Sequence, residues 1–205
     1  MTQWRVVTAV LLGLVATAPE ASFHTWQVNK LYSNADGSVQ FIELQEGFGL
    51  GGQQFLMGLT ITSQQGTTTR TFVFPANLPD GNTAGKSFLV ATPGFAALGI
   101  VIPDYIVPPG FLFTSGSTVN FAGVDSVTYA ALPVDGLLSL SRSGGTATNS
   151  PRNYAGQTGS VIPVAPPVAA SPNEIPVLDN LAILLLASFV LAAGLAGRRR
   201  LRDRG

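Results

Sequence analysis

The sequence contains no cysteine and a single histidine, His24, among its 205 residues. Without cysteine, the chain has no disulfide framework, no thiolate metal site and no cysteine nucleophile. One histidine cannot complete a usual zinc site, and we therefore expect no metal and no cofactor. A Ser-His-Asp triad is also disfavoured, because His24 precedes the first predicted strand and a triad needs a base that is held in position.

Charged residues are also scarce, at 11% of the chain. The formal net charge is zero, but five arginines occur in the last eight residues, so the rest of the chain is mildly acidic. Nucleic-acid binding needs a basic face that displaces counterions, and we expect no nucleic-acid partner. Glycine and proline are abundant, with 23 and 14 residues, and this composition is typical of a β-rich domain with many turns.

The N-terminus has the layout of a secretory signal peptide, which we assign to residues 1–21. Arg5 precedes an apolar run at 6–18, and small residues follow. The cleavage point stays open, because a small-x-small sequence ends at Ala18 and a cut after Ala21 or Ser22 fits as well. The apolar run is too short to span a bilayer, which disfavours an uncleaved N-terminal anchor.

The C-terminal segment 175–205 has three consecutive parts. A motif comes first, then the uncharged run 181–197, and then an arginine cluster. The motif is Ile175, Pro176, Val177, Leu178 and Asp179, and the cluster is Arg198, Arg199, Arg200, Arg202 and Arg204. At about 1.5 Å per residue, the run predicts a transmembrane helix of about 25 Å, and snorkelling arginines extend it toward the roughly 30 Å of a bilayer core. The positive-inside rule keeps the arginines cytoplasmic, so the body of the protein is expected to face outward.

Motif, apolar helix and terminal arginines in this order resemble C-terminal sorting signals of the PEP-CTERM type. The stretch IPVLDNLAILLLA, residues 175–187, is most similar to the IPTL-CTERM variant, with Val177 in place of the usual threonine. The resemblance implies that an exosortase, a membrane-embedded transpeptidase, recognises the motif and cuts near it. The helix would then be a temporary anchor. The alternative is a permanent stop-transfer helix.

A proline-rich linker at 161–174, VIPVAPPVAASPNE, joins the body to this tail. Prolines lack a backbone donor, and such segments resist folding and stay extended. The linker is therefore predicted to be a stalk that presents the motif to a processing enzyme.

Residues 22–160 are predicted to form one all-β domain. Short stretches with strand periodicity are separated by turn signals, a pattern that favours an antiparallel sandwich or barrel. In the second strand, Val39 and Phe41 should face opposite to Ile42 and Leu44. The predicted strands are 25–32, 38–45, 54–63, 67–75, 86–92, 117–123, 125–132 and 136–143, with one helical turn within 93–100.

Four motifs of this body occur in an order that resembles lamin-tail domains. They are SNADGSVQFIELQ at 33–45, FVFP at 72–75, GKSFLVAT at 85–92 and DSVTYAALPVDGLLSLSR at 125–142. The resemblance covers residues 26–158 and implies an immunoglobulin-like antiparallel β-sandwich, closed by SPRNYAG at 150–156. The role of such domains in the nuclear lamina does not transfer, because a fold does not carry its function with it.

Glu43 and Glu46 are the candidates for a catalytic carboxylate pair of the kind used in glycoside hydrolysis. Lamin-tail strands also have a glutamate at the position of Glu43, which favours a solvent-facing or turn-capping carboxylate and no catalytic residue.

Five aspartates fall near predicted loops, where carboxylates can bind calcium. They are Asp36, Asp80, Asp104, Asp125 and Asp135. No spacing matches a calcium motif, and Asp-Gly is the ordinary turn dipeptide, so structural turns are favoured.

Two loops are also unusual. The apolar, proline-rich stretch 100–113 is either a binding surface or a cover for one end of the core. The glycine-rich stretch 47–52 lacks the strand-to-helix setting that a phosphate loop requires.

These features predict an exported, non-catalytic surface or envelope protein whose β-sandwich is a binding or structural module. The membrane and an exosortase-like processing enzyme are the expected partners, and an association with exopolysaccharide or the extracellular matrix is a further expectation. The alternatives are a permanently membrane-anchored external domain and a carbohydrate hydrolase.

Overall fold

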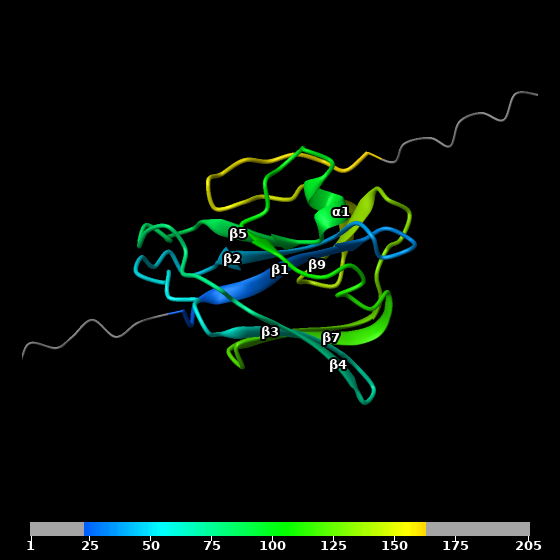
Figure 1. Ribbon diagram of the computed structural model, residues 1–205, viewed down its shortest axis with the longest axis horizontal. Coiled ribbons are helices and arrows are strands. Elements are labelled where there is room, and N and C mark those ends of the chain that lie inside the picture. Colours follow the sequence, from blue (N-terminus) through cyan, green and yellow to red (C-terminus); the bar gives the residue numbers. More distant parts are fainter. Residues whose placement is uncertain (1–22, 163–205) are drawn as a thin grey trace, which may run out of the picture. The chain divides into compact units, whose positions relative to one another are not determined.

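The computed structural model describes residues 23–162, which form two β-sheets with almost no helix (Figure 1). The predicted all-β class is confirmed. The strands are β1 (Trp26–Ser33), β2 (Gln40–Glu46), β3 (Thr60–Gln65), β4 (Thr68–Val73), β5 (Ser87–Ala91), β6 (Tyr105–Ile106), β7 (Ser115–Phe121), β8 (Asp125–Ala131), β9 (Leu138–Ser141) and β10 (Thr146–Thr148). The one helix described is α1 (Pro93–Ala96), within the predicted helical turn.

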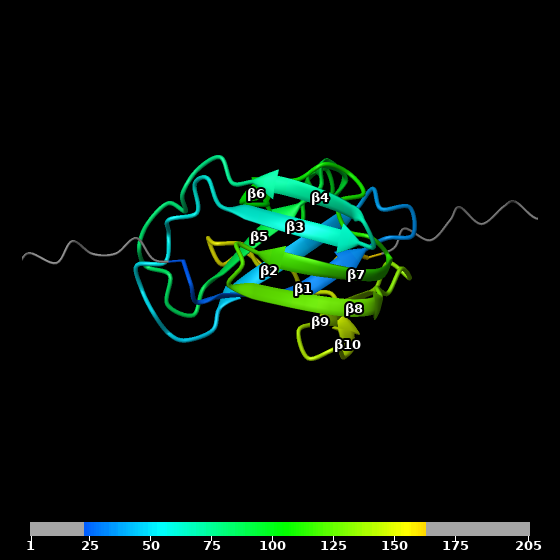
Figure 2. The ribbon, with the colours of Figure 1, turned by 90° about the horizontal axis from the view of Figure 1, so that it is seen from below.

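The six-stranded sheet has the order β10-β9-β1-β2-β5-β6, and the four-stranded sheet has the order β4-β3-β7-β8. Figure 2 shows the four strands of the smaller sheet side by side, in front of the larger one. Described strand pairs are antiparallel except β5 and β6, which pair in parallel. The arrangement is a β-sandwich with one parallel edge pair.

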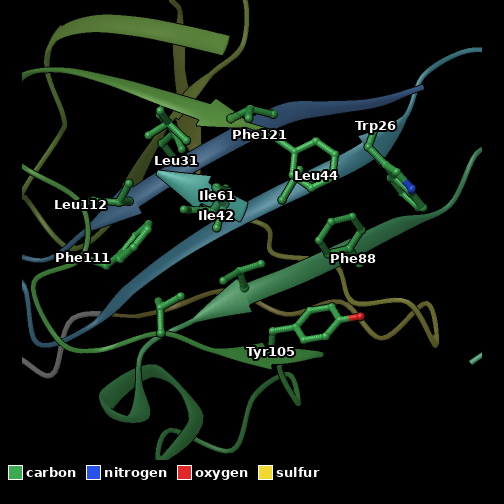
Figure 3. Close-up of a cluster of buried hydrophobic side chains, with 14 of the residues drawn as sticks. Trp26, Leu31, Ile42, Leu44, Ile61, Phe88, Tyr105, Phe111, Leu112 and Phe121 are labelled. Atoms are coloured by element: carbon green, nitrogen blue, oxygen red, sulfur yellow. The ribbon is translucent and has the colours of Figure 1, made fainter. Parts of the chain in front are cut away.

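The main core lies between the two sheets (Figure 3). β1, β2 and β5 contribute one side, and β3, β7 and β8 contribute the other. The large buried residues include Trp26, Leu44, Ile61, Phe74, Phe88 and Phe121. The predicted alternation of the second strand is confirmed, since Ile42 and Leu44 enter this core and Phe41 does not.

A second cluster covers the outer face of the six-stranded sheet. Its members are Tyr32, Phe41, Leu89, Ala91, Phe95, Val101 and Val161, with Val39 packed against them. Phe95 comes from α1, and Val161 comes from the segment 149–162, which we call the C-terminal strap. Figure 1 shows α1 and the strap on the side of this sheet opposite β3 and β7. The larger sheet is therefore buried on both faces.

The first strand contains a bulge between Val28 and Lys30, and the bulge is held by a charged pair. Asp125 accepts a hydrogen bond from the Val28 amide at 2.7 Å and two from the guanidinium of Arg142, at 2.6 and 2.7 Å. The bulge shifts the alternation by one residue, which places Lys30 and Tyr32 on the outer face of the sheet and Leu31 in the core.

Several strand predictions differ from the structure. The predicted strand 54–63 begins only at Thr60, because 54–59 contains a tight turn in which Gly58 has a φ of 84°. Strands β6 and β10 were not predicted, since two or three residues are too short to show a period of two.

The sequence signals at both ends fall outside the described residues. These are the signal peptide, residues 163–174 of the predicted linker, the sorting motif, the predicted membrane helix and the arginine cluster. Val161, the first residue of the predicted linker, lies in the second cluster. Within 23–162, no helix is both long and apolar enough to span a membrane.

Candidate binding face

Glu43 is buried, with 2% of its surface exposed, and it makes four kinds of contact. Its carboxylate pairs with the Lys30 ammonium at 3.0 Å and accepts hydrogen bonds from Asn29 at 2.9 Å and Ser87 at 3.3 Å. It also accepts the amide of Arg152, in the C-terminal strap, at 3.0 Å. The prediction that Glu43 is solvent-facing or turn-capping is wrong, because the strap covers this part of the sheet.

Glu46 caps loops. It accepts the amides of Phe48, Gly49 and Gly85 at 2.8–2.9 Å. Burial alone would raise the pKa of Glu46, but the backbone donors outweigh this effect and hold the pKa below its ordinary value. Residues three apart in a strand point to opposite faces of the sheet, so Glu43 and Glu46 do not converge on one substrate position.

The five aspartates also act within the fold. Asp36, Asp80 and Asp135 accept hydrogen bonds from amides two or three residues later in their own turns. Asp125 holds the bulge of β1, and Asp104 accepts the amides of Leu89 and Tyr154 at 2.7 and 2.9 Å. Among residues 23–162, no group of three or more His, Cys, Asp and Glu side chains could hold a metal ion.

Asp104 provides a test of these roles by pH. Burial raises the pKa of Asp104 above its ordinary value of 3.8, against the lowering effect of its two backbone donors. Between pH 3.8 and the raised pKa of the folded state, the folded protein binds more protons than the unfolded chain. The contribution of Asp104 to the free energy of unfolding therefore falls as the pH rises through this range.

An asparagine side chain cannot titrate, so the unfolding free energy of Asp104→Asn minus that of the wild type should increase with pH. Urea unfolding at about pH 3, 5 and 7 measures this difference. If the difference between these two free energies of unfolding is constant with pH, the pKa of Asp104 is not raised in the folded protein.

The remaining sequence candidates lie in structural positions. His24 stacks on the neighbouring ring of Phe23, with centroids 4.4 Å apart. Five side chains of 100–113 are buried in the core clusters, and Tyr105 among them donates a hydrogen bond to the Ala76 carbonyl at 3.0 Å. This outcome agrees with the cover interpretation of that loop. The stretch 47–52 is an exposed loop held by Glu46.

The outer face of the four-stranded sheet differs from all these sites, because its side chains are uncharged, mostly polar and directed outward. We call it the hydroxyl face. Its positions are Thr60, Thr62 and Gln64 of β3, Thr69, Thr71 and Val73 of β4, Gly116, Thr118 and Asn120 of β7, and Ser126, Thr128 and Ala130 of β8. The alternate residues of the same strands point inward and include Ile61, Val119, Phe121 and Tyr129 of the core.

The strand register arranges these polar side chains in two rows. One row is Thr71, Thr62, Asn120 and Ser126, and the other is Thr69, Gln64, Thr118 and Thr128. Neighbours within a row are about 4.8 Å apart, and the rows are separated by about 6.7 Å, the spacing of alternate residues in a strand. The hydroxyls of Thr118 and Thr128 are 2.8 Å apart and share a hydrogen bond.

A hollow of about 390 Å³ lies at one end of the hydroxyl face. It is lined by Gln64, Gly66, Gly116, Thr118, Thr128 and Tyr129, among others. The hollow depends on Gly116, because a Cβ at this position would meet only the Ala130 carbonyl, at 3.9 Å. A larger side chain at 116 would therefore fill the hollow without straining the backbone.

A second hollow, of about 220 Å³, lies beside Arg70. Its guanidinium is already engaged, since it lies 3.7 Å from the centre of the Phe113 ring and donates a hydrogen bond to the Gly110 carbonyl. The charged group at this hollow is therefore already engaged within the protein, and the hydroxyl face is the better candidate for ligand binding.

The hydroxyl face was not predicted from the sequence, although its signal is present. Polar uncharged residues recur with a period of two in 60–64, 69–71, 118–120 and 126–128. The signal becomes a surface only when the register between the strands is known. Comparison of the chain with protein-family models, curated proteins and solved structures finds no match.

Proposed function

We propose that the protein is an exported, non-catalytic component of the cell surface or envelope, and that its β-sandwich is a binding module. We further propose that the sandwich is of the immunoglobulin-like, lamin-tail type. One observation carries the proposal of a binding module. The buried carboxylates are used to hold the fold, whereas a broad face of hydroxyl and amide groups points to solvent.

The role of the charged groups argues against hydrolysis by Glu43 and Glu46. Glycoside hydrolysis needs two carboxyl groups that flank one bond. Glu43 is paired with Lys30 beneath the C-terminal strap, and Glu46 caps loops from the opposite face of β2. Neither carboxylate offers the free, convergent geometry that such a reaction needs.

Export and sorting rest on the two ends of the sequence. The apolar run after Arg5 would direct secretion, and the terminal arginines would stop transfer with the sandwich outside. An exosortase-like enzyme would then recognise the motif from Ile175 to Asp179 and remove the helix. The proline-rich linker that precedes the motif would present it to this enzyme.

The intact mass of the mature protein from its own cells tests this route. We expect a species that lacks the N-terminal 18–22 residues and everything after about residue 175. Pro176→Ala should keep the C-terminal helix if the motif is recognised, and Pro172→Ala, in the linker, should be processed normally. A wild-type mass that includes the arginine cluster would contradict sorting and identify a permanent anchor.

A further inference from the structure

We propose that the hydroxyl face binds a neutral polysaccharide chain. This inference deepens the proposed function and rests on it, because an exported domain meets polysaccharide outside the cell. The proposal specifies which class of ligand the hydroxyl face binds.

The first argument is charge. The chain has 11 basic and 11 acidic residues, yet none of the outward positions of β3, β4, β7 and β8 is charged. An anionic polymer would need Lys or Arg to replace its counterions, and a cationic one would need carboxylates. A face without charge is complementary to a polymer that also has none.

The second argument is hydrogen bonding. Threonine and serine hydroxyls donate and accept, and the amides of Gln64 and Asn120 do both as well. Sugar hydroxyls have the same dual capacity. Four strands at about 4.8 Å give each row a length of about 14 Å, so a ligand that uses the face fully is an extended chain. The hollow at Gly116 provides a recess for a group that projects from that chain.

The composition of the face also disfavours a folded protein as the ligand. Protein interfaces depend on buried aromatic and arginine anchors, and the outward positions contain none. The only apolar side chains among them are Val73 and Ala130, at the edges of the sheet. Without an aromatic platform, each sugar unit contributes little, and affinity must come from many contacts along a polymer.

The test is binding of the full-length chain, purified in detergent and immobilised for biolayer interferometry. The probes are dextran, yeast mannan and a soluble β-1,3-glucan as neutral polymers, with alginate as the anionic comparison. We expect binding of at least one neutral polymer that is insensitive to salt between about 0.05 and 0.5 M, and weaker binding of alginate.

Three variants locate the site. Thr128→Glu adds a charge on the face beside the hollow, and Gly116→Leu fills the hollow, so each should weaken binding by about tenfold or more. Ala131→Glu adds the same charge to an exposed position of β8 whose side chain points away from the face, and it should bind as the wild type does. Thermal unfolding confirms that each variant is folded.

Binding of none of the neutral polymers, tighter binding of alginate, or full binding by Thr128→Glu would overturn the proposal. Pull-down of a protein in place of a polysaccharide would also overturn it. These failures are distinct from failure of the proposed function, because export and processing are read from the intact mass and not from binding.

Discussion

Phe74→Ala is expected to lower the free energy of unfolding by about 4 kcal/mol. The side chain is 1% exposed and lies at the centre of the aromatic part of the main core. Its ring meets those of Phe72, Phe88, Tyr105 and Phe121 edge to face, at centroid distances of 4.9–6.0 Å. These rings come from strands of both sheets, so removal of Phe74 leaves a cavity that no single element can fill.

The matched control is its neighbour, Val73, whose side chain points outward and is 55% exposed. Val73→Ala should change stability by less than about 0.5 kcal/mol. Urea unfolding of both variants measures the comparison. A loss for Phe74→Ala close to that of Val73→Ala would show that the two sheets do not pack through this ring.

The sequence predicts the strands of this domain well where a period of two is clear. In β2, the apolar residues Ile42 and Leu44 alternate with Phe41, and the structure places the first two in the main core and Phe41 in the outer cluster. Where glycines and short segments interrupt the period, the prediction fails. Residues 54–59 have strand composition, but their turn closes through the Leu59 amide and the Leu56 carbonyl, at 2.9 Å.

The outer layer could not be predicted, because its contacts join parts of the chain that are far apart. Tyr154 in the C-terminal strap donates its amide to Asp104 and its hydroxyl to Asp80. Asn149 accepts the amide of Val161 at 2.6 Å, which fixes the far end of the strap. No local pattern indicates that this loop-like segment covers a sheet, since it has neither strand nor helix periodicity.

The candidate site shows the same limit. In a sequence with few charges, each carboxylate is a conspicuous candidate for a functional residue. In the structure, these carboxylates accept backbone amides in turns, at the bulge of β1 and in the strap. The hydroxyl face is made of common residues that carry no individual signal. Its register brings Thr62 beside Thr71 and Asn120, and that juxtaposition is a property of the sheet and not of any one segment.

Glu43→Ala should lower the free energy of unfolding by about 3 kcal/mol, the lower end of the cost of breaking a buried ion pair, because the Lys30 side chain is 26% exposed. The substitution leaves the Lys30 ammonium without its carboxylate and removes acceptors from Asn29 and Ser87. It also frees the Arg152 amide, so the strap loses one of its attachments to the sheet. Lys30 still donates to the Ser150 carbonyl at 2.8 Å, which retains part of that attachment.

Two measurements separate this structural role from a catalytic one. Urea unfolding gives the loss of stability, and amide hydrogen exchange should show faster exchange at Arg152 and Tyr154 than in the wild type. Glu43→Gln keeps an oxygen acceptor and should lose less stability than Glu43→Ala. Gln45→Ala, on the same face of β2 but less buried, is the matched control and should cost under about 1 kcal/mol. Unchanged stability and exchange in Glu43→Ala would show that this carboxylate is dispensable for the fold, and a catalytic role for it would then have to be reconsidered.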